Sequence, residues 1–144
     1  MKIGFIAQPK TPITVEDARF AAEHGMPHLE LVWDDFTEAH WERRQAEKNM
    51  LREFGVGLSA AGFWRRNPIH PDAAERARCH EELKRYLDYC HELECPVLVT
   101  GGGTLLGPDV EACARAFSAA FEPILQHAER RGVRIALYGV HGRT

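Results

Sequence analysis

The chain has 144 residues, of which 44% are hydrophobic and 27% charged, and its formal net charge at pH 7 is −3. These values are typical of one globular domain, and without a basic block we expect no binding to nucleic acid or to an anionic membrane. No apolar stretch reaches the roughly 20 residues that a membrane-spanning helix needs. Because the sequence enters a strand almost at once, we also expect no signal peptide and a cytoplasmic location.

The four cysteines are Cys79, Cys90, Cys95 and Cys113, and none of them forms a Cys-x-x-Cys pair. A zinc site made of cysteines needs closer spacing than this. We therefore expect reduced, partly buried thiols, as in cytosolic proteins.

A unit of helix, helix stop and short apolar run occurs four times along the chain. The stop is a glycine at Gly25, Gly55 and Gly132, which suits a position with positive φ, and Cys95 is predicted to take that place in the third copy. Each apolar run is too short for a core helix and suits a buried strand. The four copies read AAEHGMPHLELV, LREFGVGLSAAG, CHELECPVLVTG and AERRGVRIALYG.

With the opening run KIGFIA, this pattern predicts five strands separated by four helices. The strands are expected at residues 3–7, 28–33, 56–61, 97–100 and 133–138. The helices are expected from Thr14 to Gly25, over 38–54, from Asp72 to about residue 93, and from Asp109 to 131. Thr14 followed by Asp17 is a short version of the capping box, and Pro123 is expected to kink the last helix.

Apolar positions at helical spacing predict the buried side of each helix. They are Val15, Ala18, Ala21 and Ala22; Trp41, Met50, Leu51 and Phe54; Leu83, Tyr86, Leu87 and Cys90; and Ala116, Phe117, Ala120, Phe121, Ile124 and Leu125. The histidines on these helices, namely His24, His80, His91 and His127, are expected at the surface, and His70 is expected in a solvated loop.

Single helices between strands imply parallel pairing with right-handed crossovers, which two α/β folds satisfy. One is a flavodoxin-like, doubly wound sheet of five strands. The other is a (β/α)8 TIM barrel, which needs about 250 residues and of which this chain would be only a part. The pattern stops at the fifth strand without a covering helix, and Glu30 lies within the second strand. Both details favour the partial barrel.

Four stretches, in their order, resemble one family over nearly the whole chain. They are KIGFIA, EHGMPHLEL, HPDAAERARCHEELKRYLDYCHELECPVLVTGGG and FEPILQHAERRGVRIAL. The sequence is similar to the sugar phosphate isomerase/epimerase family, the xylose-isomerase-like TIM barrels of the AP endonuclease 2 superfamily, which includes endonuclease IV. The resemblance implies that residues 1–144 are a single domain, the N-terminal half of such a barrel, with strands 1–5 and helices 1–4.

In a barrel of this kind the site lies at the carboxyl ends of the strands. Alternation turns Glu30 into the barrel, where its carboxylate either binds substrate hydroxyls or forms a salt bridge to a neighbouring strand. Trp33 and Trp64 either pack under a sugar ring or pack under a loop. The glycines from Gly101 to Gly103 either bring amides to an anion or form a flexible loop. The expected substrate-binding residues are Glu30, Trp33, Asp34, Trp64, Thr100, Gly101, Gly102 and Tyr138.

The resemblance also implies a divalent metal (Mn, Mg, Co or Zn), held partly by a glutamate that ends strand five. This chain has Ala136-Leu137-Tyr138 at that place, so the ligand is missing, and His141 either substitutes for it or is simply exposed. The remaining ligands of the family belong to strands six to eight. We therefore expect the chain by itself to bind metal poorly.

The leading prediction is the N-terminal portion of an isomerase or epimerase that acts on a small polyhydroxy carbonyl compound by metal-assisted proton transfer. The fragment alone is expected to be inactive, because half a barrel exposes two strand edges that a second copy or a longer polypeptide would cover. One alternative is a non-catalytic ligand-binding or degenerate homologue. Another is an endonuclease-IV-like DNA repair enzyme, against which the acidic charge balance argues.

Overall fold

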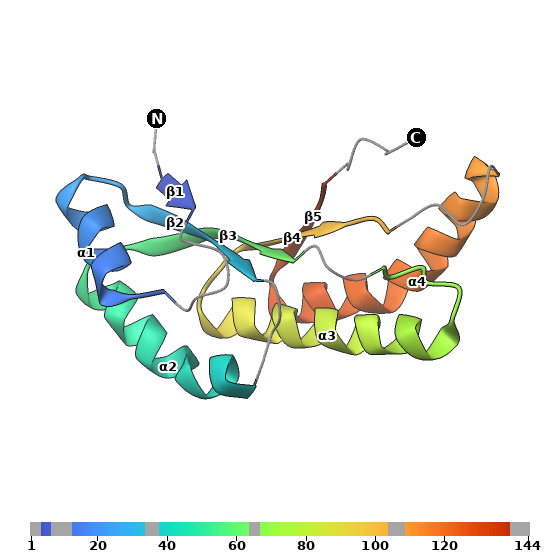
Figure 1. Cartoon of the computed structure of the whole chain (residues 1–144), viewed down its shortest axis with the longest axis horizontal. Coiled ribbons are helices and arrows are strands. Elements are labelled where there is room, and N and C mark those ends of the chain that lie inside the picture. Colours follow the sequence, from blue (N-terminus) through green and yellow to red (C-terminus); the bar gives the residue numbers. More distant parts are fainter. Residues whose placement is uncertain (1–3, 7–12, 34–37, 64–66, 104–108, 139–144) are drawn as a thin grey trace.

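The computed structural model describes residues 4–6, 13–33, 38–63, 67–103 and 109–138. Five strands alternate with four helices, and all the helices lie on the same side of the sheet (Figure 1). The strands are β1 (Gly4–Ile6), β2 (His28–Trp33), β3 (Gly57–Phe63), β4 (Val97–Gly101) and β5 (Arg134–Tyr138). The helices are α1 (Val15–Glu23), α2 (Glu38–Glu53), α3 (Ala73–Glu92) and α4 (Val110–Arg131).

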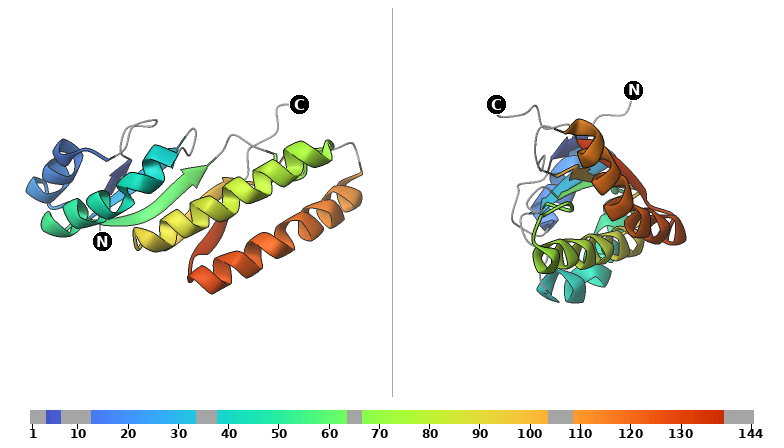
Figure 2. Two further views of the ribbon diagram at one scale, coloured as in Figure 1. Left: turned by 90° about the horizontal axis from the view of Figure 1, so that it is seen from below. Right: turned by 90° about the vertical axis from the view of Figure 1, so that its right-hand side faces the viewer.

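The strand order settles the choice between the two predicted folds. Each strand pairs in parallel with the next one in the chain, in the order β1-β2-β3-β4-β5. A flavodoxin-like sheet would place β1 inside the sheet and helices on both faces. Here α2, α3 and α4 run side by side beneath one face, as Figure 2 shows from below. The prediction of a partial TIM barrel is confirmed, and the doubly wound alternative is wrong.

The side of the sheet that faces the helices holds the hydrophobic core. Leu29 and Leu31 of β2 are buried there, and the register sets them beside Leu58 and Ala61 of β3. An irregularity between Leu29 and Glu30 preserves this alignment, because one extra residue of β3 is accommodated there. The opposite face, which we call the inner face, carries the residues between these positions.

Local capping chemistry explains where the helices begin. The Thr14 hydroxyl accepts a hydrogen bond from the Asp17 amide at 3.1 Å, and the Asp17 carboxylate accepts one from the Thr14 amide at 2.9 Å. Asp72 and Asp109 cap α3 and α4 through their carboxylates. The predicted helix starts are therefore confirmed, and Pro123 lies inside α4 as expected.

The helix stops follow the prediction at three of the four copies. Gly25, Gly55 and Gly132 have φ values of 64° to 66°. In the third copy the left-handed residue is Glu94, with φ 58°, and the assignment to Cys95 was wrong by one position. Leu93 caps α3, so the reversal falls on the residue directly after it. Cys95 is instead buried, and its amide donates to the Cys90 carbonyl at 2.8 Å.

The outermost helices are less buried than their sequences indicate. Val15 of α1 is 43% exposed and Leu125 of α4 is 44% exposed, and Ala22 is exposed as well. Among the described elements, α1 contacts α2 on one side and α4 contacts α3 on one side. The apolar stripe of a helix with one helical neighbour is covered over only part of its width, which corrects the prediction at these three positions.

Two buried polar groups join α2 to α3 within the helical layer. The Tyr89 hydroxyl donates a hydrogen bond to the Glu47 carboxylate, and Glu47 was not predicted to be buried. Burial raises the pKa of Glu47, and burial together with the nearby carboxylate raises the pKa of Tyr89. This pair lies on the helix side of the sheet and serves packing.

All four cysteines are free and buried, as expected for reduced thiols. Within the described part of the chain, no helix is long and apolar enough to cross a membrane.

Candidate functional site

The inner face of the sheet is built from small and apolar residues. One row across it consists of Val32, Gly62, Val99 and Ala136, which the register places in line on β2, β3, β4 and β5. Small side chains leave room above such a row, so a ligand can approach the backbone closely. The inner face is therefore mainly apolar, and the polar side chains on it are isolated from one another.

Glu30 carries a carboxylate on the inner face. It is half-buried on β2, in register with Ile6 on one side and Ala60 on the other. Among the residues that the structure describes, none forms a hydrogen bond or an ion pair with its carboxylate. The salt bridge to a neighbouring strand is thus not found within these residues. The two oxygens are available to accept hydrogen bonds from a ligand.

Glycines at the carboxyl end of β4 form the edge of the inner face. A Cβ atom at Gly101 would meet no described atom within 4 Å, whereas one at Gly102 would contact the Phe117 ring at 3.5 Å. Gly103 has φ 94°, and a Cβ there would lie 2.4 Å from Asn67 Oδ1. Only glycine fits this place, which presses the end of β4 against the segment that follows β3.

The same segment is held by Asn67, whose side-chain oxygen accepts a hydrogen bond from the Ile69 amide at 3.0 Å. The His80 ring contacts the Pro68 carbonyl oxygen at 2.8 Å, so His80 anchors this segment to α3 and is not a free surface group. The sequence prediction did not single out Asn67, and it named Gly103 only as part of the glycine run, not among the expected substrate-binding residues. The Asn-Pro dipeptide and the third glycine of the run were the available signals.

The structure does not bring Thr100 to the inner face. Its side chain is only 2% exposed, and its neighbour in register, Phe63, stacks on Tyr86 of α3 at 4.4 Å between ring centres. Thr100 therefore points toward the helices, because alternation along β4 gives the inner face to Val99 and Gly101. Its proposed contact with substrate has no support from this placement.

The other predicted site residues fall into two groups. Tyr138 ends β5 in register with Gly101 and is exposed, so these two lie side by side at the carboxyl end of the sheet. The backbone of Trp33 ends β2. Asp34, Trp64 and His141 lie outside the described residues.

The described residues do not fit a divalent metal. No group of three or more His, Cys, Asp or Glu side chains comes together among them. Glu30 lies on β2 and Tyr138 on β5, and strands β3 and β4 separate them. We derive no chemical step through a metal from this part of the chain.

His127 also differs from its predicted surface role. Its Nε2 atom lies 2.7 Å from Asp88 Oδ1, which Arg131 also contacts at 2.6 Å. This cluster joins α3 to α4 and is part of the helical layer. His24 and His91 are exposed, as expected.

Solved structures with the same fold include several sugar epimerases. A xylose isomerase domain protein from Planctomyces limnophilus matches with a TM-score of 0.75 and 13% identity, over 97% of this chain and 54% of its own. A 3-keto-D-glucoside 4-epimerase from E. coli matches with a TM-score of 0.74 and 20% identity, over 95% and 55%. A D-psicose 3-epimerase from Clostridium cellulolyticum H10, solved with D-tagatose, gives 0.75 and 16%, over 95% and 52%.

The chain thus spans about half the length of these structures. No curated protein matches the sequence. A family model described as xylose isomerase-like TIM barrel matches residues 18–138, which include four of the five strands and all but the start of α1. The chain belongs to the xylose isomerase-like TIM barrel family.

Proposed function

We propose that this chain is the N-terminal half of a carbohydrate isomerase or epimerase, and that its inner face binds a small polyhydroxy carbonyl compound. Membership of the family and the epimerases among proteins of this fold support the proposal. In barrels of this type the ligand lies at the carboxyl ends of the strands, where Gly101 and Tyr138 are found.

Glu30 is the observation that carries the proposal. Its half-buried carboxylate lies on the inner face and has no partner among the described residues. The surrounding residues Val32, Ala60 and Gly62 are apolar or small. A sugar presents hydroxyl groups that donate to carboxylate oxygens, and its C–H groups pack on apolar surface. The Glu30 carboxylate matches the hydroxyl groups of such a ligand, and the apolar inner face matches its C–H groups.

We assign Glu30 to substrate binding and orientation. Isomerisation and epimerisation move a proton at carbons next to a carbonyl group, which needs a base within reach of that carbon. The described residues supply one inner-face carboxylate and no metal cluster. We expect the chain by itself to bind the compound without converting it, and turnover to require the strands that complete a barrel.

Calorimetric titration with D-psicose and D-fructose tests the binding. We expect saturable binding by the natural chain and about tenfold weaker binding by Glu30→Gln, because a charge-assisted hydrogen bond is replaced by a neutral one. Glu53→Gln, an exposed glutamate on α2, is the control and should bind like the natural chain. Equal binding by Glu30→Gln would contradict the assignment.

A non-catalytic ligand-binding protein is the second candidate function. Tyr138 favours it, because this residue ends β5 where the family resemblance implies a metal-binding glutamate. Both candidates bind a sugar, so turnover separates them. Conversion of D-fructose in the presence of Mn²⁺ by the protein with a completed barrel, followed by chromatography, would contradict the non-catalytic candidate. Binding without conversion by that same protein would contradict the enzymatic one.

A further inference from the structure

A cavity of about 260 Å³ lies at the opposite end of the sheet, where the strands begin. It is open to solvent on one side and is lined by the last turns of α2, the segment after α3, and the starts of β2 and β3. The candidate sugar site is placed on the inner face toward the carboxyl ends, and its Glu30 lies two residues along β2 from His28, which lines the cavity. The volume is just below the roughly 300–1,000 Å³ of common small-molecule sites.

The interior of this cavity is apolar. Leu51 of α2, Val56 and Leu58 at β3, and Leu93 after α3 line it, and all four belong to the buried core. Moving an apolar group from water into such a space is favourable, in proportion to the apolar surface that it buries. The interior therefore suits a hydrocarbon body.

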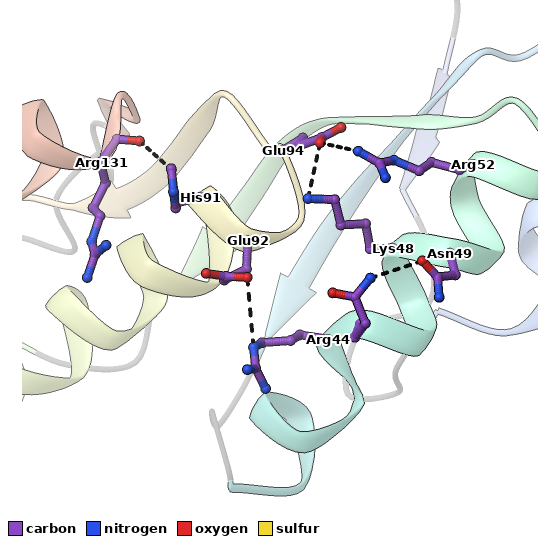
Figure 3. A network of polar contacts seen from close by, with 9 residues as sticks. Arg44, Lys48, Asn49, Arg52, His91, Glu92, Glu94 and Arg131 are labelled. Atoms are coloured by element: carbon purple, nitrogen blue, oxygen red, sulfur yellow. Dashed lines mark hydrogen bonds and ion pairs between the residues drawn. The ribbon is translucent and has the colours of Figure 1, made fainter.

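The mouth of the cavity carries an excess of positive charge. Lys48 Nζ and Arg52 Nη2 approach the same Glu94 oxygen, Oε1, at 3.1 Å and 2.6 Å (Figure 3). Two cations thus share one carboxylate. The neighbouring Glu92 does not offset the surplus, because it lies 4.0 Å from Arg44, a cation of its own. A ligand with one negative charge would balance the mouth.

His28 contributes an unpartnered polar atom to the cavity wall. Its Nδ1 atom is buried and has no hydrogen-bond partner in the described part of the chain. A buried polar atom without a partner is unfavourable, and a ligand that hydrogen-bonds to it would remove that cost. A Cβ atom at Gly57 would lie 3.6 Å from this nitrogen without a clash, so there is space beside it.

Glu94 holds the mouth in place at a conformational cost. Its φ of 58° is the left-handed value that glycine provides at the three other helix stops. A residue other than glycine is strained in that region, because its Cβ atom lies too close to the following carbonyl oxygen. A glutamate at this stop places its carboxylate on Lys48 and Arg52 and so fixes both cations over the cavity. Strain of this kind is concentrated at binding sites.

We propose that this cavity binds a small organic monoanion with an apolar body, such as an arylcarboxylate. Lys48 and Arg52 bind the anionic group on the side not taken by Glu94. The apolar body fills the space between Leu51, Leu58 and Leu93. The His28 ring donates a hydrogen bond to a ligand oxygen in the tautomer that carries hydrogen on Nδ1.

Titration with 2-naphthoate, followed by amide chemical shifts in NMR spectra, tests the proposal. We expect saturable binding, with shifts at residues around Gly57 and Glu94, and at least tenfold weaker binding of 2-naphthalenemethanol and of inorganic phosphate. The alcohol has no charge and phosphate has no apolar body. The absence of saturable naphthoate binding would overturn the proposal, as would equal binding of either comparison compound.

Three variants locate the site. Lys48→Ala should weaken naphthoate binding about tenfold, the value of one charge-assisted hydrogen bond. Gly57→Ala should weaken it as strongly, because the added methyl group fills the space beside His28 without a clash. Lys84→Ala is the control, since Lys84 pairs with a single glutamate, Glu81, on α3 at 2.8 Å. Circular dichroism verifies folding. Natural affinity in both folded test variants, or a matching loss in the control, would overturn the assignment.

Discussion

The two faces of the sheet differ in what their residues do. The helix side is closed, with Leu29, Leu31 and Leu98 buried against the helices. The inner face is open, with a row of small residues and the half-buried Glu30. Because hydrophobic burial dominates folding free energy, the helix side determines stability. The inner face can carry a carboxylate because the stability of the fold does not depend on burial at that face.

The largest expected effect comes from the closed side. Leu98→Ala removes a side chain that is 0% exposed and should lower the free energy of unfolding by about 3 kcal/mol. Leu137→Ala, on the adjacent strand at 53% exposed, is the matched control and should cost within about 0.5 kcal/mol. Chemical denaturation measures both. A large loss at Leu137 would show that another surface covers the edge strand.

A glycine substitution at the carboxyl ends should follow in size. Gly103→Ala places a methyl group 2.4 Å from Asn67 Oδ1 at a φ of 94°, and we expect a loss of about 2 kcal/mol. Gly101→Ala, where no described atom lies within 4 Å, should change stability by less than about 0.5 kcal/mol. Equal losses would mean that the two glycines are not distinguished by packing.

The buried Glu47 should show itself in the pH dependence of stability. Its pKa is raised by burial, so the folded state keeps a proton that the unfolded state has already lost. The contribution of this group is complete below the ordinary carboxyl pKa and is lost as the pH rises through the raised value. Glu47→Gln should therefore gain stability relative to the natural chain as the pH rises above 4.5, the ordinary pKa of a glutamate. Urea denaturation at several pH values measures the difference.

The partner of Glu47 sharpens this test. Tyr89→Phe removes the hydrogen bond that lowers the pKa of Glu47, so the loss of stability with rising pH should become larger and extend to higher pH. If the free energy of unfolding depends on pH in the same way for the natural chain and for Glu47→Gln, a raised pKa at this position is contradicted.

The smallest effect is expected on the open side. Glu30→Gln changes a half-buried carboxylate that has no described partner, so it should alter the free energy of unfolding by less than about 0.5 kcal/mol. Thermal unfolding measures this change, and the sugar titration measures the separate loss of binding. A large loss of stability would make Glu30 a structural residue.

Local chemistry in the sequence determined the elements and most of their ends. Thr14, Asp72 and Asp109 cap helices through atoms a few residues away, and the apolar runs after each helix stop became strands. Alternation also placed Glu30 opposite the core. These features depend on neighbours in the chain, so a single sequence contains them.

Contacts between distant residues decided the rest. Glu47 meets Tyr89 across 42 positions, and Glu94 meets Arg52 across 42 positions, so neither the burial of the first nor the ion pair of the second follows from a local pattern. Gly103 is required because Asn67 lies against it, and the Thr100 side chain is buried because the helices cover that face of β4. Only the packed sheet and its helices bring these groups together, since side-chain burial is set by what lies on the other side.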